Sequence, residues 1–204
     1  MAARNGITVE VTHPDAEGRL ILADVLAAAS EDEPDLIVDF ATLTSVMRSV
    51  IGPDIAPFFT NDTLLAEALE SASHRTADPL WRVPLHAAYR RWLSPGIADL
   101  ANHRPDIAGG EPIYAALFLE RFVGAGIPWV HFDIFAWSAE ARPGRAAGAA
   151  VQGVRALFEA LRLRYGADGC AARSEGPASA TDQREELSGI RRLDDDGESA
   201  RSQL

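Results

Sequence analysis

The fold is decided by residues 6–30, which read GITVEVTHPDAEGRLILADVLAAAS. Ile7, Val9 and Val11 alternate with polar residues, and this two-residue period predicts a half-buried strand. From Gly18 to Ser30 the apolar residues recur at helical spacing, which predicts an amphipathic helix. A strand that leads directly into a helix is the repeating unit of α/β folds.

After this stretch, strands and helices continue to alternate up to Tyr165. Residues 36–40 form a short apolar run of the kind that is buried on both faces, and residues 129–137 have the character of a central strand. Further helices are expected over residues 43–51, 64–73, 113–123 and 151–161. We therefore predict an α/β domain in which flanking helices cover a layered mixed sheet. Three or four strands are few for such a sheet, which could be the second half of a larger one.

The composition changes at about Gly166. Residues 166–204 contain no aromatic residue, many small or polar ones, and the acidic run Asp194–Asp196. Such a segment cannot bury enough apolar surface to offset the entropy of ordering it. We expect a folded domain over residues 1–165 and a disordered acidic tail over residues 166–204.

The charge balance narrows the possible functions. The 204 residues carry 30 acidic and 19 basic side chains, a net charge of −11, and every basic residue is an arginine. Nucleic acids and anionic membranes are disfavoured as partners because they need clustered cations. The absence of lysine excludes lysine Schiff bases and P-loop lysines. A single cysteine, Cys170, together with no recognisable leader or spanning segment, predicts a cytoplasmic protein.

The segment His13–Leu20 is the most informative for chemistry, because it joins the first strand to the first helix. Asp15 and Glu17 are two residues apart, so on an extended segment both carboxylates face one side, as a divalent cation requires. Arg19 follows in the first helical turn, with a guanidinium that suits carboxylate, carbonate or phosphate. The alternative is structural: Asp15 caps the helix, Glu17 favours its dipole and Arg19 is a solvated cation.

The remaining polar candidates have structural interpretations. His131 and Asp133 lie two apart on the central strand and resemble a ligand pair, but at this depth we expect them to be satisfied internally. His74, His86 and His103 have no partner spacing, so we expect them at the surface.

Several collinear segments carry a resemblance to a known family. Asp15–Leu20, DAEGRL, matches the end of the signature NTDAEGRL of the leucine aminopeptidase (cytosol aminopeptidase) family. The likeness continues through residues 35–44 (DLIVDFATLT), 80–85 (LWRVPL), 115–122 (AALFLERF) and 129–134 (WVHFDI). Residues 1–165 thus resemble part of the C-terminal catalytic domain of that family.

The resemblance implies a metallo-exopeptidase that releases N-terminal residues from peptides, with two divalent metals, manganese or zinc, and a hexameric assembly. By position, Asp15 and Glu17 correspond to metal ligands, with Glu17 bridging. Arg19 corresponds to the catalytic arginine that holds a bicarbonate. Thr42 and Leu43 correspond to residues that contact the substrate through their backbone.

The departures from the family pattern are also informative. His13 and Pro14 replace an asparagine and a threonine, and Ser45 replaces a glycine, where its side chain would crowd the backbone next to the substrate. His13 is either a third ligand or a partly buried residue with a hydrogen-bonded ring.

The family's lysines are a larger departure, because its upstream segment supplies a metal-binding and a catalytic lysine and this sequence contains none. Two carboxylates are too few for a dinuclear site. Two hypotheses follow: an aminopeptidase whose N-terminal half comes from another chain, and a truncated non-catalytic fragment that keeps the fold or the assembly surface.

Overall fold

The structure is a computed structural model that describes residues 1–107 and 109–166. Met1–Arg162 form one compact unit, and the described residues from Leu163 to Gly166 lie outside it. The predicted acidic tail, apart from Gly166, lies outside the described residues. In order along the chain, the elements are β1 (Val9–Glu10), α1 (Glu17–Ser30), β2 (Ile37–Ala41), α2 (Val46–Ile51), β3 (Ala56–Thr60), α3 (Thr63–Thr76), β4 (Leu80–Arg82), the 3₁₀ helix η1 (Ala87–Leu93), β5 (Leu100–Ala101), α4 (Glu111–Glu120), β6 (Trp129–Asp133), β7 (Trp137–Ser138), β8 (Gly148–Ala149) and α5 (Val154–Tyr165).

The main sheet has the strand order β2-β6-β3-β4. β2 pairs with β6 and β3 with β4 in parallel, whereas β3 and β6 are antiparallel, so the sheet is mixed as predicted. β6 is the buried central strand that the apolar run at 129–137 predicts, although it ends at Asp133. The prediction that residues 36–40 are buried on both faces is wrong, because β2 is an edge strand in which only Ile37 is buried.

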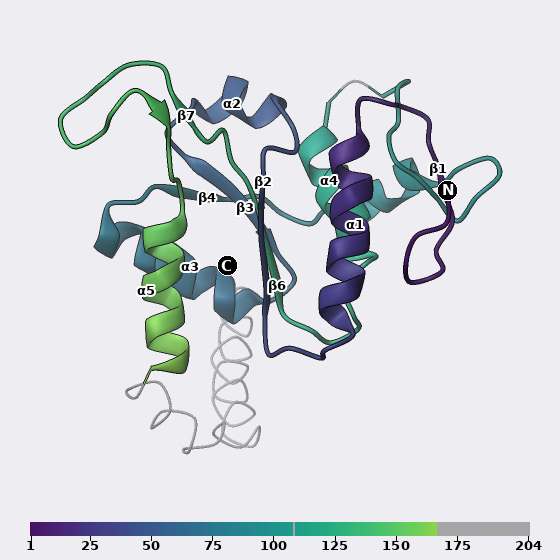
Figure 1. Cartoon of the computed structure of the whole chain (residues 1–204), viewed down its shortest axis with the longest axis horizontal. Helices are drawn as coiled ribbons and strands as arrows, with labels where there is room; N and C mark the ends of the chain where they lie inside the picture. Colours follow the sequence, from purple (N-terminus) through teal and green to yellow (C-terminus); the bar gives the residue numbers. More distant parts are fainter. Residues whose placement is uncertain (108, 167–204) are drawn as a thin grey trace, which may run out of the picture. The chain divides into compact units, whose positions relative to one another are not determined.

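Helices cover both faces of this sheet (Figure 1). Phe59 and Trp129 point to one face and pack with residues of α1 and α4. Phe58, Val130 and Phe132 point to the other face and pack with α3 and α5. The two-residue period of the strands therefore divides the apolar residues into two cores, and the α/β class with flanking helices is confirmed. Among the described residues, no helix has the length and apolar character needed to cross a membrane.

The long helices match their predictions closely. α1 begins one residue before the expected Gly18 and ends at Ser30. α3 is capped by Asp62, whose side chain accepts a hydrogen bond from the Leu65 N–H at 3.0 Å. α2 ends at Ile51 and is followed by the capping residue Gly52, whose φ of +79° favours glycine.

Two strand predictions need correction. The alternating run at residues 7–11 yields only β1, which pairs with β5 in a separate two-stranded ladder and does not join the main sheet. β3 was not predicted at all, because it is short and contains Pro57, which marks a run as an improbable strand. Pairing of β3 with β6 begins only after the proline, at Phe58.

Candidate functional site

The candidate site lies where β2 and β6 end. Ala41 pairs with Asp133 at the carboxyl ends of these parallel strands, where ligands commonly bind in α/β sheets. One Asp133 oxygen accepts hydrogen bonds from the backbone N–H groups of Leu43 (2.7 Å) and Thr44 (2.9 Å). The other oxygen accepts a hydrogen bond from the Thr44 hydroxyl at 2.5 Å. A single buried carboxylate thus fixes the loop that follows β2.

Burial changes the pKa of the Asp133 carboxyl that holds this loop. It raises the pKa of the Asp133 carboxyl, while the hydrogen bonds from Thr44 and Leu43 work in the opposite direction. The expectation that His131 and Asp133 are satisfied internally is confirmed, because His131 Nδ1 lies 2.5 Å from an Asp39 oxygen. His131 and Asp133 are therefore occupied in holding β2 and its loop against β6.

The start of α1 approaches the same loop. A Cβ built on Gly18 would lie 3.8 Å from Leu43 Cδ1. Asp15 and Glu17 are both exposed. The N-cap residue is Ala16, with no side-chain cap hydrogen bond, so the alternative that Asp15 caps the helix is wrong. Glu17 does lie in the first turn, where a carboxylate favours the helix dipole.

Arg19 is buried, with 1% of its surface exposed, so the alternative that it is a solvated cation is also wrong. Nη1 donates to the Asn102 carbonyl at 2.6 Å, and Nη2 donates to Glu111 Oε1 at 3.0 Å. The guanidinium carbon lies 5.8 Å from the centre of the Tyr114 ring. Burial lowers the pKa of Arg19, and the nearby Glu111 carboxylate opposes this effect.

Two adjoining cavities bring the predicted residues together. One, of about 320 Å³, is lined by all five predicted site residues, Asp15, Glu17, Arg19, Thr42 and Leu43. The other, of about 460 Å³, shares three of these residues with the first. Its further lining includes Ser45, Arg48, Glu111, Asp133 and Phe135.

The described residues do not fit a complete metal centre. Within residues 1–107 and 109–166 there is no group of three or more histidine, cysteine, aspartate or glutamate side chains placed to hold a metal ion. Asp15 and Glu17 offer two carboxylates, whereas each metal needs at least three or four donors. The metal site that the family resemblance implies is therefore not formed by these residues alone.

His103 was expected at the surface, and this prediction is wrong. Its side chain is only 17% exposed, and Nδ1 lies 3.0 Å from the Tyr114 hydroxyl and 3.6 Å from Glu111 Oε1. Its ring lies 4.7 Å from that of His13, which is partly buried as one alternative held. Burial lowers the pKa of His103. The surface prediction is confirmed for His74 and His86, which are exposed.

Sequence reasoning missed the partners of Arg19. Glu111 is 92 residues away from it and Asn102 is 83 residues away, so no local spacing connects them. The only signal was an acidic residue after Gly109-Gly110, two residues before the helix expected at 113–123. Glu111 is the first residue of α4, where a carboxylate favours the helix dipole.

Comparison with known proteins identifies the family of this chain. The family model described as the cytosol aminopeptidase family, catalytic domain, matches residues 1–158. A probable cytosol aminopeptidase of Synechococcus sp. (strain CC9311) is 48% identical over 159 residues, which cover 77% of this chain and 32% of that protein. The chain therefore spans about a third of the length of this relative.

Solved structures show the same likeness. The cytosol aminopeptidase from Coxiella burnetii superposes with a TM-score of 0.75 at 48% identity, over 80% of this chain and 36% of that one. The bottromycin maturation enzyme BotP in complex with Mn gives a TM-score of 0.71 at 42% identity, over 78% and 36%. With the family model covering most of its length, the chain belongs to the cytosol aminopeptidase family.

Proposed function

We propose that this chain contributes the C-terminal part of a metal-dependent aminopeptidase centre that hydrolyses N-terminal residues from peptides. The observation that carries the proposal is that one cavity is lined by all five predicted residues, from the start of α1 and from the loop after β2. Asp15 and Glu17 would be ligands of divalent metals, manganese or zinc, and Thr42 and Leu43 would contact the substrate through their backbone.

The local structure supports these roles. Asp15 and Glu17 are exposed, so their oxygens are accessible to a cation. The loop carrying Thr42 and Leu43 is held by Asp133, so its backbone groups are positioned before a peptide arrives. BotP, which is 42% identical, is known in complex with Mn, and this favours a divalent metal here.

The missing metal donors must come from outside the described residues. We propose that another polypeptide, or a further part of a longer one, supplies them and completes a homo-oligomer of the hexameric type in the cytoplasm. Two observations support a larger assembly: the chain spans about a third of the length of its relative, and β2 is an edge strand beside the site. The alternative, a non-catalytic fragment, is also consistent with the absence of a three-donor metal group among the described residues.

Complementation separates the two functions. The purified chain would be mixed with the part of the Coxiella aminopeptidase that it does not match, and hydrolysis of leucine p-nitroanilide measured with manganese. We expect no hydrolysis by the chain alone and hydrolysis by the mixture. Asp15→Asn or Glu17→Gln should lower the rate on the order of 100-fold or more, because each removes a metal ligand. Asp32→Asn, at an exposed position in the turn after α1, is the matched control.

Two outcomes would contradict the proposal. The fragment hypothesis is favoured if the two polypeptides bind each other but the mixture stays inactive. The site assignment is wrong if hydrolysis survives both the Asp15 and the Glu17 substitution, or if the chain alone binds manganese tightly after both carboxylates are removed.

A further inference from the structure

The guanidinium of Arg19 is already occupied by groups of this chain. Its two terminal nitrogens donate to the Asn102 carbonyl and to Glu111 Oε1. Its Nε is buried and has no hydrogen-bond partner among the described residues. A buried cation needs a neighbouring anion, and Glu111 is the carboxylate that forms an ion pair with it, at 3.0 Å.

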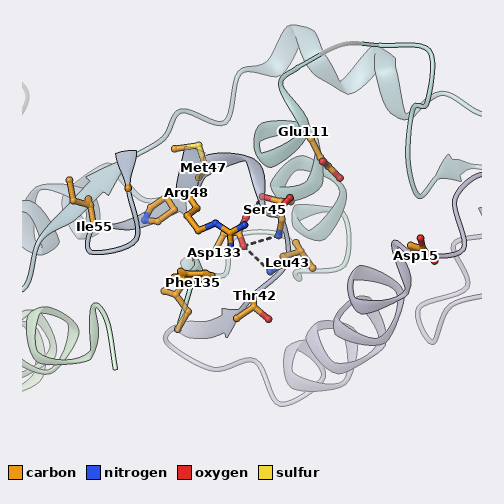
Figure 2. Close-up of a pocket in the computed structure, with 14 residues that line it drawn as sticks. Asp15, Thr42, Leu43, Ser45, Met47, Arg48, Ile55, Glu111, Asp133 and Phe135 are labelled. Carbon is orange, nitrogen blue, oxygen red and sulfur yellow. Dashed lines mark hydrogen bonds between the residues drawn. The ribbon is translucent and has the colours of Figure 1, made fainter. Parts of the chain in front are cut away.

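The surroundings of Glu111 are those of a built site. It begins α4 directly after Gly110, which has a φ of +72°, and Pro112 follows it, so the local backbone is constrained. His103 Nδ1 lies 3.6 Å from its Oε1, and the Tyr114 hydroxyl bonds to the same histidine nitrogen. The Glu111 side chain is 29% exposed and lines the larger cavity together with Asp15 and Leu43 (Figure 2).

A free oxyanion would have to compete with this arrangement. Bicarbonate binds an arginine best through two adjacent N–H groups, one of which would be Nη2. Nη2 already donates to Glu111, and the neighbouring Nε is buried. Asp15 and Glu17 also lie along the cavity that Arg19 lines, and their charges oppose the entry of a second anion. An incoming anion could bind only after Glu111 moved away.

We propose that Glu111 is a built-in carboxylate that occupies the anion position of Arg19, so that this site takes no free bicarbonate. The inference rests on the proposed function, because the resemblance assigns bicarbonate to Arg19, and the described structure disagrees with that assignment. Glu111 is then a positioning residue: it neutralises Arg19 and holds the guanidinium between α1 and α4. An assembled enzyme would be insensitive to added bicarbonate.

The test uses the purified chain without metal or peptide. Thermal unfolding is followed with increasing sodium bicarbonate or sodium formate, against sodium chloride at equal ionic strength. The wild type should respond equally to all three salts. Glu111→Ala should unfold about 10 °C lower, because Arg19 loses its counterion. Bicarbonate or formate at ten times its Kd should then restore about 3 °C or more beyond the chloride effect.

Glu120→Ala is the matched control, since Glu120 ends the same helix and pairs with Arg90 at 2.5 Å. It should show no rescue by either anion. Equal rescue of both alanine variants, no rescue of Glu111→Ala, or stabilisation of the wild type by bicarbonate beyond chloride would overturn the proposal.

A measurement on the wild type keeps the test decisive if Glu111→Ala does not fold. The ¹³C line width of ¹³C-bicarbonate should not change when the wild type is added, and broadening that disappears with Arg19→Gln would overturn the proposal. Neither experiment measures hydrolysis. Failure of the complementation assay therefore does not affect the conclusion on anion binding at Arg19. Failure of the anion-binding test likewise does not affect the conclusion on hydrolysis.

Discussion

The two neighbours of the central strand β6 differ in how completely the chain buries them. On one side, every residue of β3 is buried, and Phe58 and Phe59 have no exposed surface. On the other side, β2 has one buried residue, Ile37, and the rest are half-buried. Both strands contact β6 over several residue pairs, so the difference does not come from weaker pairing.

The difference comes from what covers each strand. β3 lies between β6 and β4, under apolar residues of α3 and α5. β2 has β6 on one edge, and among the described residues no strand pairs with its other edge. Ile21 and Val25 of the neighbouring α1 are 66% and 55% exposed. The candidate site lies on the β2 side of β6, which we call the open side. Its chemistry therefore depends on surfaces that the described residues leave uncovered.

The largest effect on the free energy of unfolding is expected from a comparison of two phenylalanines that contact the same ring. Phe58 on β3 and Phe40 on β2 both contact the Phe132 ring, at centroid distances of 5.9 and 4.5 Å. Phe58→Ala should lower the free energy of unfolding by about 3–5 kcal/mol, because it empties a fully buried site. Phe40→Ala should cost about 1–2 kcal/mol, since the Phe40 side chain is only partly buried and its removal leaves a site open to solvent. Urea denaturation measures both, and equal losses would remove the distinction between the two sides.

The second prediction concerns the carboxylate that fixes the loop on the open side. Asp133→Ala should cost about 2 kcal/mol and leave the N–H groups of Leu43 and Thr44 without their acceptor. Asp133→Asn keeps one acceptor oxygen and should cost less. Urea denaturation gives the cost, and hydrogen exchange should accelerate at the amides of Leu43 and Thr44. Acceleration that spreads equally to β3 would show a general loss of stability.

The elements that could be predicted from sequence are those whose pattern is long and local. The helices α1 and α3 carry several turns of apolar periodicity and a clear start or cap, so their bounds came out within a few residues. β3 is five residues long and contains a proline, so its pattern was too weak. The alternation at residues 7–11 indicated a half-buried strand, but alternation carries no information on which strand it joins, and β1 joined β5.

The candidate site also contains residues that could be predicted from the sequence and residues that could not. Asp15 and Thr42 were expected in one site from the family resemblance, and they line one cavity although β1 and β2 belong to different sheets. Asn102, His103 and Glu111 reach Arg19 or its neighbours from loops and a helix start some ninety residues away. The contact between Glu111 and Arg19 depends on how α4 packs on α1, and a single sequence does not encode such packing in any local spacing.

The third prediction probes the open edge of β2 directly. The backbone bonds from Ile37 N–H to Pro128 and from Ile134 N–H to Ala41 fix the register of the parallel ladder. Alternation in that ladder turns the N–H groups of Val38 and Phe40 to the other edge. These two amides should exchange about tenfold faster than those of Ile37 and Ala41, and a polypeptide that pairs with the edge should slow them.

Residue-resolved hydrogen exchange by NMR measures this contrast. Equal protection along β2 would mean that some other part of the chain covers the edge, and the two sides of β6 would then be alike. The amides of β3, which pair on both edges, serve as the internal reference.

The smallest effect is a pH dependence confined to the open side. Burial lowers the pKa of His103 below its ordinary value, opposed by Glu111 and supported by Arg19 and His13. A lowered folded-state pKa gives stability that is fully present above about pH 6.5, the unfolded value, and is lost as the pH falls through the folded-state pKa. The free energy of unfolding should therefore fall between pH 8 and pH 5.5 more steeply in the wild type than in His103→Gln. His74→Gln, at an exposed position on α3, should follow the wild type. If His74→Gln flattens the profile as much as His103→Gln does, the titration is not specific to the Arg19 surroundings, and the two sides of the sheet respond to acid alike.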